Sequence, residues 1–129
     1  MRKILLGLVI SFVCALPIAA FTQGYPSKPI RIISPFAAGG GNDVICRLVA
    51  TKLTETMKQQ VIVETKAGAS GIIGTEAAAR AAPDGYTIVL VPSGHTVNAT
   101  LYKKLPYDSI RDFTPISLAA VSPLVLAMH

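Results

Sequence analysis

The sequence lacks several groups of residues, and each absence removes a class of function. There is no tryptophan among the 129 residues, and the 12 lysines and arginines are scattered rather than interleaved with aromatic side chains. A nucleic-acid surface is therefore not indicated, because such surfaces combine a clustered basic patch with stacking aromatics. The two histidines, His95 and His129, are far apart and have no acidic cluster beside them. We therefore expect no metal site.

Cysteine is also scarce. Cys14 lies in the apolar leader described below, which leaves Cys46 as the one remaining cysteine. A single thiol excludes an internal disulfide and a cysteine-based zinc site. Because Cys46 falls among Val44, Ile45 and Leu48, we expect it to be a small buried apolar residue.

The first twenty residues have the pattern of an export signal. Arg2 and Lys3 precede the apolar stretch 4–16, and residues 17–20 supply small side chains for cleavage, which we expect after Ala20. Cys14 suggests a lipoprotein, but Val13 stands where a small residue is needed. The apolar stretch is too short for a membrane span. Residues 21–129 carry 10 basic and 7 acidic side chains, a net charge of 10 − 7 = +3.

Three strand–loop–helix units follow a proline-rich lead-in. Each unit has a short apolar strand, a loop of small or polar residues, and a helix. The expected strands are 30–36, 61–64 and 87–91, and the expected helices are 43–59, 72–82 and 96–102. Strands that alternate with helices predict an α/β fold with a parallel sheet. The sequence ends inside the apolar run 122–129, so we expect it to be the front portion of a longer protein.

The three strand-to-helix loops consist mainly of small and polar residues. In an open parallel sheet such loops meet at the carboxyl edge, where ligands bind. Gly39–Gly41 is the most informative of them, because bare backbone N–H groups at a helix start form an anion-binding site. A tight turn is the alternative explanation of these glycines. We expect Asp43 to cap the helix or neutralise its dipole, and to hold the loop amides in position, rather than to act as a catalytic acid.

Two motifs suggest other functions. Gly68–Gly74 resembles a variant of the dinucleotide fingerprint, but residues 65–67 separate it from the strand, and no acid ends the next strand. Ser93 and His95 suggest an exported serine hydrolase, but they lack a Gly-x-Ser-x-Gly elbow and a neighbouring acid. Ligand contact or loop packing explains Ser93 and His95 better. A nucleotide-dependent enzyme and a hydrolase stay as alternatives.

Several motifs, taken in order, resemble one protein family. They are Tyr25–Ile33, Pro35–Asp43, Gly68–Gly71, Ala82–Thr87, Ser93–His95, Leu105–Asp108 and Asp112–Pro115. Their order and spacing resemble the tripartite tricarboxylate transporter receptors, which are Bug-type extracytoplasmic solute-binding proteins of bacteria. The resemblance covers nearly all of the chain after residue 20.

This resemblance implies the parallel-sheet lobe of a type II periplasmic binding protein, here truncated. It implies a signal peptide at 1–20, a first α/β lobe at 21–115 and a crossover strand at 116–129 toward a missing second lobe. The implied function is capture of a small carboxylate in the periplasm for delivery to integral-membrane transporter subunits. It implies no catalytic residue, no enzyme activity and no cofactor.

The matching motifs imply three walls of a ligand site, in which loop amides, hydroxyls and bridging waters hold a carboxylate. The first wall is Phe36, Ala37, Gly40, Gly41, Asn42 and Asp43, the second is Ala69, Ser70 and Gly71, and the third is Ser93, Gly94 and His95. The chain departs from the usual family residues at Ala38, Asn42, Thr65 and Ala67. These departures leave the identity of the carboxylate open.

Overall fold

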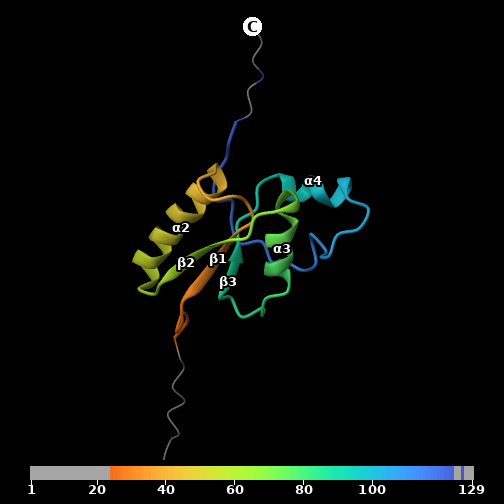
Figure 1. The fold of residues 1–129 in the computed structure, drawn as a ribbon. Helices are drawn as coiled ribbons and strands as arrows, with labels where there is room; N and C mark the ends of the chain where they lie inside the picture. The colour runs from red at the N-terminus through yellow and green to blue at the C-terminus, as the bar shows by residue number, and fades with distance from the viewer. Residues whose placement is uncertain (1–23, 124–125, 127–129) are drawn as a thin grey trace, which may run out of the picture.

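The computed structural model describes residues 24–123 and residue 126 (Figure 1). The expected signal peptide, residues 1–20, lies outside these described residues. The elements in chain order are β1 (Ile30–Ser34), α2 (Gly41–Met57), β2 (Val61–Thr65), the 3-10 turn η1 (Ala69–Gly71), α3 (Ile72–Ala79), β3 (Thr87–Val89) and α4 (Gly94–Leu101). Each of the three expected units is therefore present.

The three strands form one parallel sheet in the order β2-β1-β3. In the register, Ser34 of β1 pairs with Thr65 of β2, and Ile33 pairs with Val89 of β3. The carboxyl ends of all three strands therefore lie at one edge of the sheet. The prediction of an α/β fold with a parallel sheet is confirmed.

Helices α2 and α3 cover opposite faces of the sheet (Figure 1). On one face, Ile32 packs with Cys46 and Ala50 of α2, and all three are buried. On the other face, Gly74 of α3 lies directly against Pro35. The expectation that Cys46 is a small buried residue is confirmed.

Two strands are shorter than expected. Strand β1 ends at Ser34 rather than Phe36, and β3 ends at Val89 rather than Val91. Pro35 has no N–H group and cannot continue the ladder. Because β1 is the central strand, its neighbour β3 also loses its partner beyond this point.

Two helices begin earlier than expected. Helix α2 begins at Gly41 rather than Asp43, because Gly40 already has the extended backbone of an N-cap residue. Helix α4 begins at Gly94 rather than Thr96. In both cases a glycine with low helix propensity occupies the first turn, where propensity alone is a weak guide.

Helix α3 ends at Ala79, and the expected end at Ala82 is wrong. Pro83 follows Ala82, and the proline ring disfavours helical backbone at the residue before it. The chain then turns through the Pro83–Gly85 segment toward β3.

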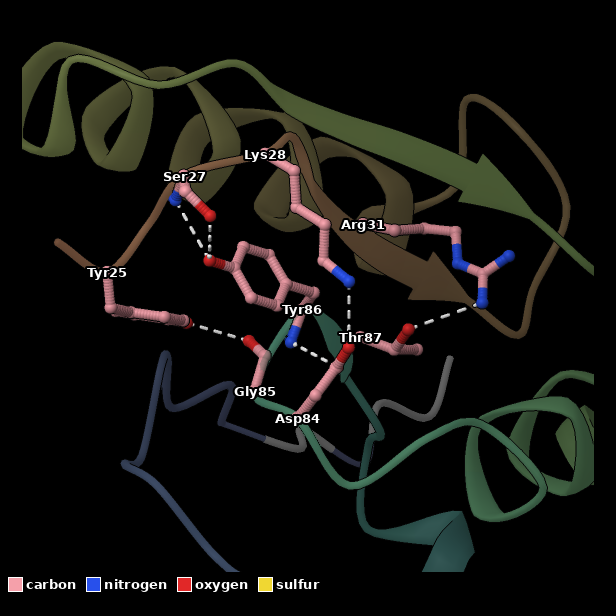
Figure 2. A network of polar contacts seen from close by, with 8 residues as sticks. All are labelled: Tyr25, Ser27, Lys28, Arg31, Asp84, Gly85, Tyr86 and Thr87. Atoms are coloured by element: carbon pink, nitrogen blue, oxygen red, sulfur yellow. Dashed lines mark hydrogen bonds and ion pairs between the residues drawn. The ribbon is translucent and has the colours of Figure 1, made fainter. Parts of the chain in front are cut away.

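A network of polar and aromatic contacts anchors the segment before β1 at the opposite edge of the sheet (Figure 2). The Tyr25 hydroxyl donates to the Gly85 carbonyl at 2.7 Å. Lys28 Nζ lies 2.9 Å from Asp84 Oδ2 and 4.3 Å from the centre of the Tyr86 ring. These contacts tie the lead-in to the turn between α3 and β3, far along the sequence from it.

The expected crossover strand contains no strand in its described part. Residues 116–123 and 126 have no helix or strand there, and Ile116 and Leu118 are exposed. The role of 116–129 as a crossover stays a prediction. Among the described residues, no helix is both long enough and apolar enough to cross a membrane.

Candidate ligand-binding site

The first wall lies between β1 and α2, and part of it is already hydrogen-bonded. The Gly39 N–H donates to Asp43 Oδ2 at 3.0 Å, and the Gly40 N–H donates to the Ala37 carbonyl at 3.3 Å. Within the described residues, the N–H groups of residues 41–43 have no acceptor, as expected for the first turn of a helix. The idea of three bare glycine amides is therefore wrong for Gly39 and Gly40, and the free donors begin at Gly41.

Asp43 fixes the loop rather than offering its charge to the crevice. It is 3% exposed, and its Oδ2 accepts from the Gly39 N–H and from Arg47 Nε at 2.9 Å. The hydrogen bond from Arg47, followed by that from Gly39, holds the pKa of the Asp43 carboxyl below its ordinary value. The expected capping role is wrong, because Gly40 is the N-cap residue and no side chain caps the helix. Asp43 instead lies in the first turn of α2, near the positive end of the helix dipole, and holds the Gly39 amide.

The Asp43 contacts predict a loss of stability in acid. Because the pKa is lower in the folded chain, the carboxylate stabilises the fold fully above its ordinary value of 3.8. That contribution is lost as the pH falls below 3.8 through the folded value. Urea unfolding of the wild type and Asp43→Asn at a series of pH values measures it. We expect the difference in unfolding free energy between the two proteins to be largest near neutral pH and to shrink as the pH falls below 3.8.

The control for this experiment is Asp84→Asn, which removes another carboxyl of lowered pKa, held chiefly by Lys28. Only the Asp43 variant is expected to increase hydrogen exchange of the Gly39 amide. A gap between wild type and Asp43→Asn that stays constant down to the most acid pH would contradict the assignment.

The side chain of Asn42 joins two strand ends. Its Nδ2 donates to Ser34 Oγ at 3.2 Å and to the Leu90 carbonyl at 3.2 Å. This side chain therefore connects the start of α2 to the chain just beyond β3. Asn42 remains a candidate ligand contact through its backbone N–H group.

The second wall is a tight turn of unusual backbone. Gly68, Ala69, Ser70 and Gly71 have φ angles of 137°, 46°, 55° and 87°. Ala69 and Ser70 are exposed, whereas Gly71 is buried against the ring of Phe36. A Cβ atom at Gly71 would lie 3.0 Å from Phe36 Cζ. Phe36 thus joins the first wall to the second.

The glycine spacing of Gly68–Gly74 has a packing cause. A Cβ atom at Gly74 would lie 2.7 Å from the Lys66 carbonyl oxygen and from Pro35. Gly74 lets α3 approach the end of β1, and Gly71 supplies left-handed backbone beside Phe36. Packing therefore accounts for these glycines without a dinucleotide.

The third wall begins α4. Ser93 is the N-cap residue, is exposed, and makes no capping hydrogen bond through its side chain. Within the described residues, the Gly94 N–H also has no acceptor. This wall therefore offers a hydroxyl and an amide at the start of a helix.

The imidazole of His95 belongs to an aromatic cluster. Its Nε2 lies 3.3 Å from the Ser109 carbonyl oxygen, and a carbonyl only accepts, so Nε2 carries the proton. The ring stacks on Tyr107, with centroids 5.9 Å apart, and meets the edge of Phe113 at 5.4 Å. His95 therefore packs the loop. Tyr107 and Phe113 lie in the motifs Leu105–Asp108 and Asp112–Pro115, but no local pattern indicates that their rings pack on His95.

Three contacts bring the walls together. Asn42 links the first wall to the chain after β3, and Phe36 links it to the second wall. Asn98 of α4 links the third unit to the second, since its Nδ2 donates to the Ser70 carbonyl at 3.0 Å. The described residues contain no cluster of three potential metal ligands. What the three loops offer together is neutral hydrogen-bond donors, which suit an anionic group.

The chain is similar to a known protein family and to individual relatives. The sequence model of the family described as tripartite tricarboxylate transporter family receptor matches residues 45–129. Protein BugT of Bordetella pertussis is 42% identical over 117 residues, which cover 89% of this chain and 35% of BugT. The chain thus spans about a third of the length of the curated relatives it matches.

Two solved structures are similar in fold. The periplasmic binding protein BugD is 43% identical with a TM-score of 0.69, and the match covers 71% of this chain and 31% of BugD. MatC from Rhodopseudomonas palustris, solved with bound malate, is 33% identical with a TM-score of 0.69. That match covers 74% of this chain and 33% of MatC. The prediction of a parallel-sheet lobe of a periplasmic binding protein fold is confirmed.

Proposed function

The chain belongs to the tripartite tricarboxylate transporter receptor family, and from this premise we propose that it is part of an extracytoplasmic receptor for a small carboxylate. The observation that carries the proposal is the set of N–H groups of residues 41–43 at the start of α2, which have no acceptor among the residues that the structure describes. They lie at the carboxyl edge of the sheet, where Phe36 contacts the second wall and Asn42 binds the chain just beyond β3.

The proposed site binds a carboxylate through uncharged donors. Each hydrogen bond to a charged group contributes roughly 1.5–3 kcal/mol, and a few such bonds in a closed crevice are sufficient for tight binding. Ser70 and Ser93, both exposed, add hydroxyl donors from the other two walls. MatC, solved with malate, suggests dicarboxylates as the first class to test.

In this proposal, residues 21–115 form the first lobe, and 116–129 leads toward the second. The leader at 1–20 directs the protein to the periplasm and is cleaved after Ala20. The partners are the integral-membrane subunits of a transporter, which receive the carboxylate. Closure of the two lobes on the ligand requires a hinge, which we place near 116–125.

The receptor performs no chemistry in this proposal. His95 Nε2 is directed to Ser109, and within the described residues no hydrogen bond joins the imidazole to Ser93. In the part of the chain that the structure describes, no hydrogen bond or ion pair joins His95 to a carboxylate, and its ring packs on Tyr107 and Phe113. This geometry lacks the ordered nucleophile, base and acid of a serine hydrolase.

One experiment tests the function on the full-length protein that carries this sequence. The protein is screened by thermal shift with mono-, di- and tricarboxylates, amino acids and aromatic acids. We expect one class of carboxylates to raise its melting temperature. Binding to the folded state alone adds about 2.7 kcal/mol at a hundredfold excess over Kd, which gives a clear shift.

The same preparation is assayed on ester and amide substrates. We expect no turnover in the wild type and none in Ser93→Ala. Turnover that disappears in Ser93→Ala would overturn the receptor proposal in favour of a hydrolase. Binding of NAD(P) in place of any acid would favour the nucleotide-dependent alternative.

A further inference from the structure

The turn in the second wall has a backbone conformation that non-glycine residues adopt only when the surrounding structure holds them in it. Ala69 and Ser70 both have positive φ, of 46° and 55°, and they lie between Gly68 and Gly71, whose φ is positive as well. Residues with a Cβ atom rarely adopt this region, least of all in succession. Such backbone persists only where the surrounding structure holds it.

Four hydrogen bonds hold this turn, and three of them are local. The Gly71 N–H donates to the Gly68 carbonyl at 2.9 Å, the Ile72 N–H donates to the Ala69 carbonyl, and Thr75 Oγ1 donates to the Gly71 carbonyl at 2.8 Å. These three bonds lie within the second unit. None of them uses the carbonyl oxygen of Ser70.

The fourth bond comes from a different unit. Asn98 Nδ2, on α4, donates to the Ser70 carbonyl at 3.0 Å, across 28 residues of sequence. Asn98 is 5% exposed, so its amide is directed into the protein and not into solvent. Removing one partner of such a buried hydrogen bond is costly, because the other polar group is left without a partner.

We propose that Asn98 is a positioning residue of the ligand site, an inference that rests on the proposed carboxylate binding. Its amide fixes the Ser70 peptide and so sets the direction of the Ser70 hydroxyl and of the exposed Ala69–Ser70 backbone. Because Asn98 follows Ser93 and Gly94 by about one helical turn on α4, it also sets the spacing between the second and third walls. Asn98 acts through Ser70 and does not touch the carboxylate.

The test measures affinity in the full-length protein by calorimetry, with malate, adipate, citrate and benzoate as probes. We expect Asn98→Ala to weaken the tightest of these acids about tenfold, the effect of one well-placed hydrogen bond. Thr100→Ala is the matched control, because Thr100 is an exposed polar residue of the same helix. We expect that control to bind like the wild type.

A second variant separates positioning from simple packing. Asn98→Asp keeps the shape of the side chain but, when ionised, offers no donor and repels the Ser70 carbonyl. Burial raises the pKa of the introduced carboxyl, and its protonated form can donate again. The affinity of Asn98→Asp relative to the wild type should therefore recover as the pH is lowered, whereas a packing role gives a constant ratio.

The outcomes distinguish the two proposals. A wild type that binds none of the acids, nor any acid in the thermal-shift screen, overturns the receptor function and this inference with it. A wild type that binds, with Asn98→Ala within about twofold of it, overturns the role of Asn98 alone. A pH-independent deficit in Asn98→Asp also overturns that role, and recovery at low pH supports it.

Discussion

Replacing Gly74 with valine is expected to lower the free energy of unfolding by about 3 kcal/mol, because the helix cannot stay against the strand. An ideal Cβ atom at this position would lie 2.7 Å from the Lys66 carbonyl oxygen and 2.7 Å from Pro35 Cα. Both are backbone atoms, so the clash is relieved only if α3 moves away from the end of β1. Urea unfolding followed by circular dichroism measures the change.

Gly41→Ala is the matched control for stability. Gly41 is also helical, but a Cβ atom there meets nothing within 4 Å. Alanine in a helix is more favourable than glycine by up to about 1 kcal/mol, so the control should unfold at the same urea concentration or a higher one. If Gly74→Val unfolds together with the wild type, then α3 does not lie as close to β1 as the structure places it.

Gly40→Val is expected to weaken carboxylate binding about a hundredfold while the fold persists. Gly40 has φ −76° and ψ 165°, extended backbone that valine adopts readily. Its Cβ atom would lie 3.3 Å from the Ala37 carbonyl oxygen, a contact that a small shift relieves. The branched side chain would then stand beside the free amides of residues 41–43 and block a ligand oxygen from reaching them.

Calorimetry on the full-length protein measures this loss, with the probe acids named above. Gly24→Val is the control, since Gly24 lies in the lead-in and a Cβ atom there meets nothing within 4 Å. Circular dichroism should show the same helix content in both variants. Unchanged affinity in Gly40→Val would place the binding site away from the first wall.

Much of the fold could be predicted from local sequence. Alternating apolar strands and helical periodicity gave three strand–loop–helix units, and Pro and Gly marked where each unit ends. The errors were at element boundaries. Helix α3 ends at Ala79 because Pro83 acts on the backbone before it, and β1 ends at Ser34 because Pro35 cannot donate.

The candidate site was less predictable in its details. The family resemblance implies the residues of the three walls, and the structure brings their loops to one edge of the sheet. The sequence did not show which loop amide Asp43 binds, or that His95 packs on Tyr107. Side-chain direction depends on neighbours that a local pattern does not contain.

The sequence by itself determined the order of the elements, the parallel sheet and the three small-residue loops, because these follow from periodicity and from the backbone preferences of glycine and proline. Only the tertiary structure decided which donors remain free for a ligand. Asn42 reaches Leu90 across 48 residues, and Asn98 reaches Ser70 across 28. Such hydrogen bonds form only once the sheet has brought distant loops together, so no local sequence pattern encodes them.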